Sequence, residues 1–203
     1  MTEFPFPSVS KAPRRVCLDV EFAGLMVIDV QNGFINTSSA LVVPTIVDLV
    51  ERWTANDRPV LMSRYRNYSG SPYERLLGWR ELHRAPDIDV IDELVGFLDH
   101  PMTTVIDKTG YTALTVGAVE HWHGAGVTDL ILCGIATDGC VFKTALDVFE
   151  AGFTPWVVVD AVASNTARHR AQEIHESALL LLARLIGAGQ LILAADIISA
   201  LTP

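Results

Sequence analysis

The stretch Gly134-Ile-Ala-Thr-Asp-Gly-Cys140-Val141 joins two contrasting patterns in this chain of 203 residues. Before it comes the apolar run Asp129-Leu-Ile-Leu-Cys133, which is typical of a buried strand. After it, the spacing of apolar residues predicts an amphipathic helix that begins near Cys140. At the start of a helix, unpaired N–H groups and the helix dipole favour the nucleophilic thiolate over the thiol. Two interpretations are open here: a reactive cysteine, or a glycine-rich turn with a small buried cysteine.

Two other apolar runs end on a charged residue. Gly24-Leu-Met-Val-Ile precedes Asp29, and Thr103-Thr-Val-Ile-Asp precedes Lys108. In open parallel α/β sheets, the ligand crevice lies outside the carboxyl ends of the strands. We therefore expect Asp29, Lys108 and Cys140 to meet at one edge of a sheet. Each residue alone also has a purely structural interpretation: Asp29 as the cap of a turn, and Lys108 as the solvated end of a strand.

Strand and helix patterns alternate along the chain, which implies right-handed βαβ crossovers. The strand candidates are the apolar runs at 24–29, 59–63, 103–107, 129–133, 155–159 and 190–194. The buried stripes of three predicted helices are Ile46, Leu49, Val50 and Trp53; Phe142, Ala145, Leu146 and Phe149; and Ile174, Ala178, Leu181 and Leu185. The expected fold is a three-layer α/β/α sandwich with a six-stranded, mostly parallel, Rossmann-like sheet. We expect one domain over residues 17–203, after an N-terminal arm at residues 1–16.

The composition of the chain argues against several classes of protein. Half of the residues are hydrophobic, and the formal net charge of −9 argues against a nucleic-acid partner. The three cysteines, Cys17, Cys133 and Cys140, are too few for a disulfide framework, and Cys133 is expected in the core. Residues 1–16 lack the apolar segment of a signal peptide, and no run is long enough to span a membrane. We expect a cytoplasmic protein without a membrane partner.

Three motifs stand in one order along the chain: Asp29-Val-Gln-Asn-Gly-Phe34, Lys108-Thr-Gly-Tyr111, and the stretch 134–141 around Cys140. With the tail from Asp160 to about residue 186, they give the chain a resemblance to the isochorismatase-like cysteine hydrolases. That family includes nicotinamidases, N-carbamoylsarcosine amidohydrolases and ureido- and biuret-type amidases. The resemblance runs from about Phe22 to Ile198, which is nearly the whole chain.

The resemblance implies a mechanism. Cys140 would attack the carbonyl carbon, Asp29 would act as general base and then acid, and Lys108 would favour the thiolate. The backbone N–H groups of Ala136 and Cys140 would form the oxyanion hole, and the Ile135–Ala136 peptide bond would be cis. No cofactor would be required, and the protein would form a homo-oligomer, either a dimer or a tetramer.

The substrate pocket is less defined by the sequence. Phe34, Trp79 and Tyr111 are candidates for its walls, although core packing explains each of them equally well. Arg64 is a candidate clamp for a substrate carboxylate, with Arg66, Arg80 and Arg84 nearby, although such arginines are more often surface or interface residues. The irregular stretch from Asn67 to Asp89 is expected to be a lid or a subunit contact.

Metal binding is not expected. Nicotinamidases of this family carry an Asp-x-His pattern after the second strand, whereas this chain has Ser63-Arg-Tyr-Arg-Asn-Tyr68 there, without a carboxylate or an imidazole. Nicotinamidase activity is therefore in doubt.

We predict a cysteine hydrolase that cleaves a C–N bond of a small amide or ureido/carbamoyl substrate through a thioester. The alternatives are an isochorismatase-type vinyl-ether hydrolase, which needs no nucleophilic cysteine, and an idle family member that serves as a binding or assembly module.

Overall fold

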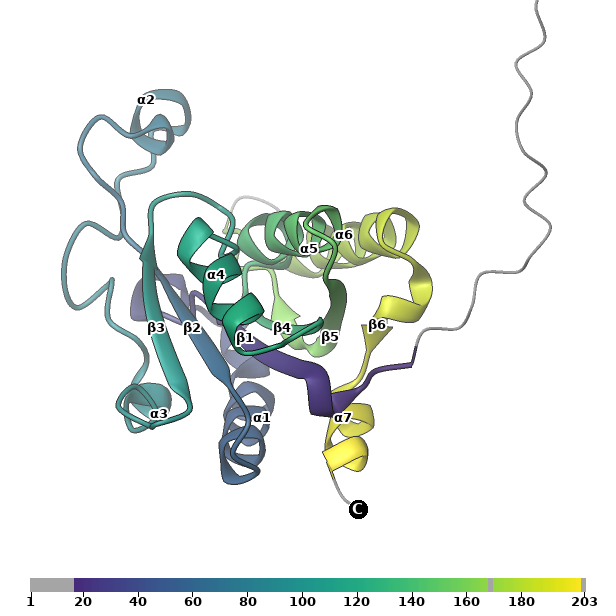
Figure 1. Ribbon diagram of the computed structural model, residues 1–203. Helices are drawn as coiled ribbons and strands as arrows, with labels where there is room; N and C mark the ends of the chain where they lie inside the picture. Colours follow the sequence, from purple (N-terminus) through teal and green to yellow (C-terminus); the bar gives the residue numbers. More distant parts are fainter. Residues whose placement is uncertain (1–16, 168–169, 202–203) are drawn as a thin grey trace, which may run out of the picture.

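A six-stranded sheet forms the centre of the computed structural model, which describes residues 17–167 and 170–201 (Figure 1). All its strand pairs are parallel, in the order β3-β2-β1-β4-β5-β6. The strands are β1 (Ala23–Ile28), β2 (Val60–Tyr65), β3 (Thr103–Lys108), β4 (Asp129–Ile135), β5 (Thr154–Ala163) and β6 (Leu191–Ile192). Every apolar run predicted as a strand is one, and the expected α/β class is confirmed. The arm expected at 1–16 lies outside the described residues.

Helices cover both faces of the sheet (Figure 1). One face carries α1 (Val43–Ala55), α3 (Asp92–Val95) and α7 (Ala194–Leu201); the other carries α4 (Val116–Gly124), α5 (Phe142–Glu150) and α6 (Ala171–Leu185). The short helix α2 (Pro72–Leu77) stands away from the sheet, beyond β2 and β3. Single turns are η1 (Val20–Phe22), η2 (Asn32–Phe34), η3 (Ser39–Val42), the π-helical η4 (Thr137–Val141) and η5 (Ala188–Gln190). Among the described helices, none has the length and apolar content to cross a membrane.

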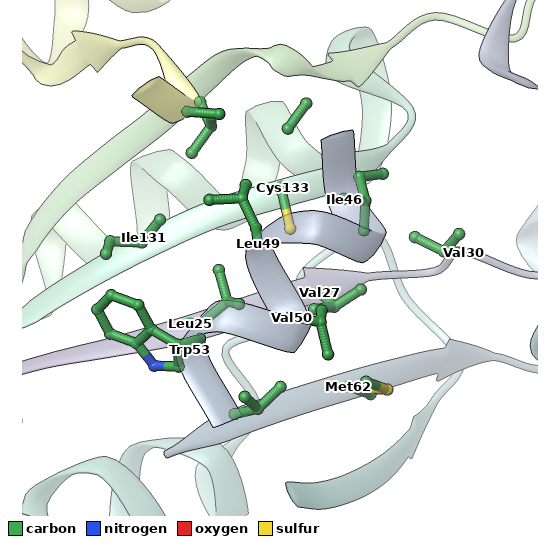
Figure 2. Close-up of a cluster of buried hydrophobic side chains, with 14 of the residues drawn as sticks. Leu25, Val27, Val30, Ile46, Leu49, Val50, Trp53, Met62, Ile131 and Cys133 are labelled. Atoms are coloured by element: carbon green, nitrogen blue, oxygen red, sulfur yellow. The ribbon is translucent and has the colours of Figure 1, made fainter. Parts of the chain in front are cut away.

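The apolar core has one layer on each face of the sheet. Figure 2 shows the layer beneath α1, where Leu49 and Trp53 pack over Leu25 and Ile131 of the central strands. Cys133 lies in this layer, fully buried, and burial raises the pKa of its thiol to about 12. Its expected role in the core is confirmed.

Two predicted helix stripes are partly wrong. The side chain of Phe149 on α5 is 50% exposed, and Leu181 and Leu185 on α6 are each 47% exposed. On α6, Ala178 and Leu182 are buried instead; they are four residues apart and therefore share one narrow face of the helix. Leucines surround this face on α6, so the sequence pattern does not identify which of them touch the protein.

The two central strands approach each other closely just before the turn that carries Cys140. Gly134 has φ 122°, and a Cβ there would lie 2.1 Å from the carbonyl oxygen of Ile28. Only glycine fits this position. Here β1 and β4 meet, and the strand order reverses, which is where open α/β sheets bind ligands.

Candidate active site

Asp29 follows β1 directly and is fully buried. Its backbone has φ 51°, in the left-handed region that aspartate tolerates better than most residues. The hydroxyl of Ser63 donates to Asp29 Oδ1 at 2.7 Å, and the Nζ of Lys108 lies 2.6 Å from Oδ2. Both carboxylate oxygens thus face a hydrogen-bond donor.

Lys108 is the last residue of β3, and only 4% of it is exposed. Its Nζ also donates to the carbonyl oxygens of Gly110 (2.8 Å) and Tyr111 (3.0 Å), and lies 3.4 Å from Cys140 Sγ. Burial alone would lower the pKa of Lys108, but the charge of Asp29 and the hydrogen bonds with Asp29 and Cys140 act against it, so that the pKa is raised. The side chain is therefore a fixed ammonium between the carboxylate and the sulfur.

Cys140 lies in the π-helical turn η4, which leads directly into α5. Thr144, one turn further along, donates its hydroxyl to the Cys140 carbonyl at 2.6 Å and accepts the backbone N–H of Ala113 at 2.8 Å. Because Ala113 belongs to the loop after Lys108, this one buried hydroxyl connects the cysteine turn to the lysine loop. The structure therefore brings Asp29, Lys108 and Cys140 together.

The surroundings of Cys140 oppose the expected effect of the helix start on its thiol. Burial raises the pKa of the Cys140 thiol, the negative charge of Asp29 raises it further, and Lys108 only partly opposes these effects. The pKa of Asp29 is also raised by its complete burial, against the opposing effects of Lys108, Ser63 and Cys140. The sulfur therefore rests as a thiol beside a carboxylate of increased basicity.

A pocket of about 500 Å³ opens over the sulfur. Five aromatic residues line much of it: Phe34, Tyr65, Tyr73, Trp79 and Tyr111. The Phe34 and Trp79 rings stack at 6.0 Å between centroids, and Tyr73 packs edge-on against Tyr65 (5.3 Å) and Tyr111 (5.1 Å). The structure thus places Phe34, Trp79 and Tyr111 at the pocket, as the sequence led us to expect.

Arg64 does not line this pocket, which speaks against the candidate role of carboxylate clamp and for the alternative of a surface residue. Its Nε pairs with Asp107 at 2.8 Å, and Arg66 pairs with the same carboxylate at 2.7 Å. The reason is the alternation of a strand: Ser63 and Tyr65 face the site, so Arg64 between them faces the other side.

The irregular stretch from Asn67 to Asp89 forms one wall of the pocket. Asn67, its first residue, closes a loop within it, because its backbone N–H donates to the Leu82 carbonyl (2.9 Å) and its side-chain amide donates to the Glu81 carbonyl (3.1 Å). Between these points, α2 and the residues after it supply Tyr73, Leu77 and Trp79 to the pocket.

The other wall is the segment between β4 and α5. The Ile135–Ala136 peptide bond is cis, and Ala136 and Cys140 both line the pocket. The Ala136 carbonyl accepts the N–H groups of Gly139 (3.0 Å) and Val141 (3.1 Å), which closes the turn. The rim of this wall includes the exposed carboxylate of Asp138.

Sequence reasoning missed Ser63, Tyr65, Tyr73 and Thr144. Ser63 carried a usable signal, since it is a polar residue at the end of an apolar run, as Asp29 is. Thr144 lies within the helix α5, and nothing in the sequence around it indicates a functional role. In the described part of the chain, no three His, Cys, Asp or Glu side chains are grouped so as to hold a metal ion.

Comparisons with known proteins show the family and the fold of this chain. A family model described as the isochorismatase domain matches residues 23–188. Nicotinamidase 3 of Arabidopsis thaliana is 28% identical over 80% of this chain and 81% of its own. A cysteine hydrolase from Pseudomonas syringae pv. phaseolicola superposes with a TM-score of 0.81 at 21% identity, over 95% of this chain and 98% of its own. A nicotinamidase from Bacillus subtilis gives a TM-score of 0.74 at 24% identity, over 84% and 99% of the two chains. This chain belongs to the isochorismatase family, whose members are hydrolases.

Proposed function

We propose that this protein is a cysteine hydrolase that cleaves the C–N bond of a small amide or ureido/carbamoyl substrate through a thioester. One observation carries the proposal: Cys140 Sγ lines the pocket 3.4 Å from an ammonium that is itself paired with a buried carboxylate at 2.6 Å. A nucleophile, a base and a fixed positive charge are the groups that acyl transfer requires.

In the first half of the proposed reaction, Asp29 accepts the proton of the Cys140 thiol as the sulfur attacks the carbonyl carbon. Lys108 stabilises the thiolate that forms, because its charge lies next to the sulfur and Asp29, once protonated, no longer neutralises that charge. The carbonyl oxygen becomes an oxyanion, which the backbone N–H groups of Ala136 and Cys140 would receive. Collapse of this intermediate breaks the C–N bond, and Asp29 gives the proton to the departing ammonia or amine.

In the second half, water attacks the thioester carbonyl. Asp29, again a carboxylate, accepts a proton from this water, and the acid product leaves as the proton returns to the sulfur of Cys140. The raised pKa values of both groups suit this exchange, because each holds a proton readily in the buried site. No step requires a cofactor.

Two further observations support a small amide. The pocket volume of about 500 Å³ lies at the lower end for small-molecule sites, and its aromatic lining suits a compact, planar substrate. A relative with 28% identity is named for hydrolysis of a small amide, nicotinamide.

The test is release of ammonia from a panel of primary amides and ureides, including nicotinamide, benzamide, biuret and N-carbamoylglycine. We expect turnover of at least one of them by the wild type and none by Cys140→Ala. Lys143→Met, which removes an exposed lysine, is the matched control and should keep full activity. If Cys140→Ala hydrolyses the same substrate at a comparable rate, the thioester mechanism is refuted. If iodoacetamide fails to modify Cys140 and no compound reacts, the protein is an idle family member.

A further inference from the structure

We propose that Ser63 is a positioning residue for the base: its hydroxyl holds Oδ1 of Asp29 and sets the pH range in which Asp29 accepts the Cys140 proton. The inference rests on the function proposed above for Asp29 and Cys140. Ser63 would be a fourth residue of the site. It lies on β2, whereas Asp29, Lys108 and Cys140 come from the ends of β1, β3 and β4.

The hydrogen bonds around Ser63 fix the direction in which its hydroxyl points. The backbone N–H of Asp29 lies 3.2 Å from the Ser63 carbonyl and 3.3 Å from its Oγ, so Oγ acts as an acceptor toward that N–H. The hydroxyl hydrogen is then free for Asp29 Oδ1, at 2.7 Å. Ser63 therefore donates to the carboxylate and stabilises its ionised form.

Burial increases the effect of the Ser63–Asp29 hydrogen bond on the ionisation of the carboxylate. Ser63 is 2% exposed and Asp29 is fully buried, and the register of β1 and β2 pairs Ile28 with Ser63, directly beside the carboxylate. Water cannot replace a lost donor in such a place, so the ionised carboxylate would lose stabilisation outright. An exposed serine would have little effect of this kind.

Other groups also act on Asp29. Lys108, from the end of β3, faces Oδ2, and the Cys140 thiol faces the carboxylate from η4. The hydroxyls of Tyr65 on β2 and Tyr73 on α2 are close enough to sense its charge. Ser63→Ala and Ser63→Thr both keep these groups in the chain, so a shift in the pH profile that only the loss of the hydroxyl produces reports the Ser63–Asp29 bond.

The experiment measures the rate of alkylation of Cys140 by iodoacetamide against pH. It uses a Cys17→Ser background, because Cys17 is exposed, whereas Cys133 is fully buried. The variants are Ser63→Ala, which removes the hydroxyl, and Ser63→Thr, which keeps it. The matched control is Thr54→Val, because Thr54 is also buried and its hydroxyl donates to carbonyls of its own helix α1.

We expect the acid limb of the Ser63→Ala profile to move to higher pH by about one unit, as loss of one hydrogen bond to a charged group predicts. The plateau rate should rise, because a more basic Asp29 draws the thiol proton away more fully; mere loosening of the site would leave the pH of the limb unchanged. Ser63→Thr and Thr54→Val should follow the parent profile.

The inference is overturned if the Ser63→Ala limb coincides with that of its parent, or if Thr54→Val shifts equally. If Ser63→Ala does not fold, Ser63→Gly removes the same donor and carries the same expectation. Failure of the proposed function has a different outcome: no amide would release ammonia, while the alkylation shift would persist.

Discussion

Removing the ammonium at the centre of the site should destabilise the protein strongly. Lys108→Met keeps most of the length of the side chain but leaves Asp29 as a buried carboxylate without its partner. At 2.6 Å and an effective dielectric constant of about 20, the Coulomb attraction between the two charges is about 6 kcal/mol. Desolvation offsets part of it, and loss of one partner from a buried pair costs about 3–5 kcal/mol of unfolding free energy.

The variant can lessen this cost by protonating Asp29, which makes the effect depend on pH. The pKa of Asp29 is already raised by burial, and loss of Lys108 raises it further. At a pH between the Asp29 pKa of the wild type and that of the variant, Asp29 is protonated in the folded variant. It is ionised in the folded wild type and in the unfolded chain. The stability of the variant relative to wild type is therefore retained at low pH and falls as pH rises, by about 1.4 kcal/mol per pH unit in that window.

Urea unfolding at pH 6 and pH 8 measures both effects. Lys143→Met, which removes an exposed i,i+4 ion pair with Asp147, is the control and should cost less than about 0.5 kcal/mol at either pH. The double variant Asp29→Asn/Lys108→Met should recover much of the loss while remaining inactive, because it leaves no orphaned charge. Equal destabilisation by Lys108→Met and Lys143→Met, or a double variant no more stable than Lys108→Met, would refute the buried-pair argument.

Three other predictions concern activity. Cys140→Ala and Cys140→Ser should each lower turnover by at least about 10³-fold with the fold retained in circular dichroism, and activity near wild type in either would exclude the thiol mechanism. Thr144→Val should lower kcat by about tenfold with little change in KM, because it disconnects the cysteine turn from Ala113. Thr144→Ser keeps the hydroxyl and should restore kcat. An unchanged kcat in Thr144→Val contradicts the positioning role. Activity should be insensitive to chelators, because Ser63–Tyr68 offers no metal-ligating carboxylate or imidazole; a stoichiometric metal whose removal abolishes activity would reverse this and support a nicotinamidase-type site.

The sheet could be predicted from the sequence because its strands are buried on both faces. Continuous apolar runs then mark each strand, and the charged residue that ends a run marks the functional edge. Asp29 and Lys108 were found by this rule, and Cys140 by its place between a strand and a helix. The aromatic candidates Phe34, Trp79 and Tyr111 followed from motifs or from an irregular stretch.

The features that could not be predicted from the sequence depend on which residues lie close together in space. The raised pKa of the Cys140 thiol follows from burial and from the charge of Asp29, which act against the local effect of a helix start. The two roles considered for Arg64 could not be separated, because the strand alternation that turns it toward Asp107 depends on which face of β2 meets the site. The exposed Leu181 of α6 shows the same limit for helices, since an all-apolar stretch does not reveal its buried side.

The strand order explains why each chemical role falls to its particular residue type. Along the order β3-β2-β1-β4, the edge of the sheet presents Lys108, Ser63, Asp29 and then Cys140 on the turn after β4. Neighbouring strands lie about 4.8 Å apart, so Lys108 starts two strands, or about 10 Å, from the strand of its partner. A long, flexible side chain can cover that distance, while the central Asp29 can be short. Lys108 pairs with Tyr65 in register, two residues beyond Ser63, so its side chain passes back over β2. Serine at position 63 is small enough to leave that path open and still offers a donor to the carboxylate. The same fold with a bulky residue at this position would separate the ammonium from the base.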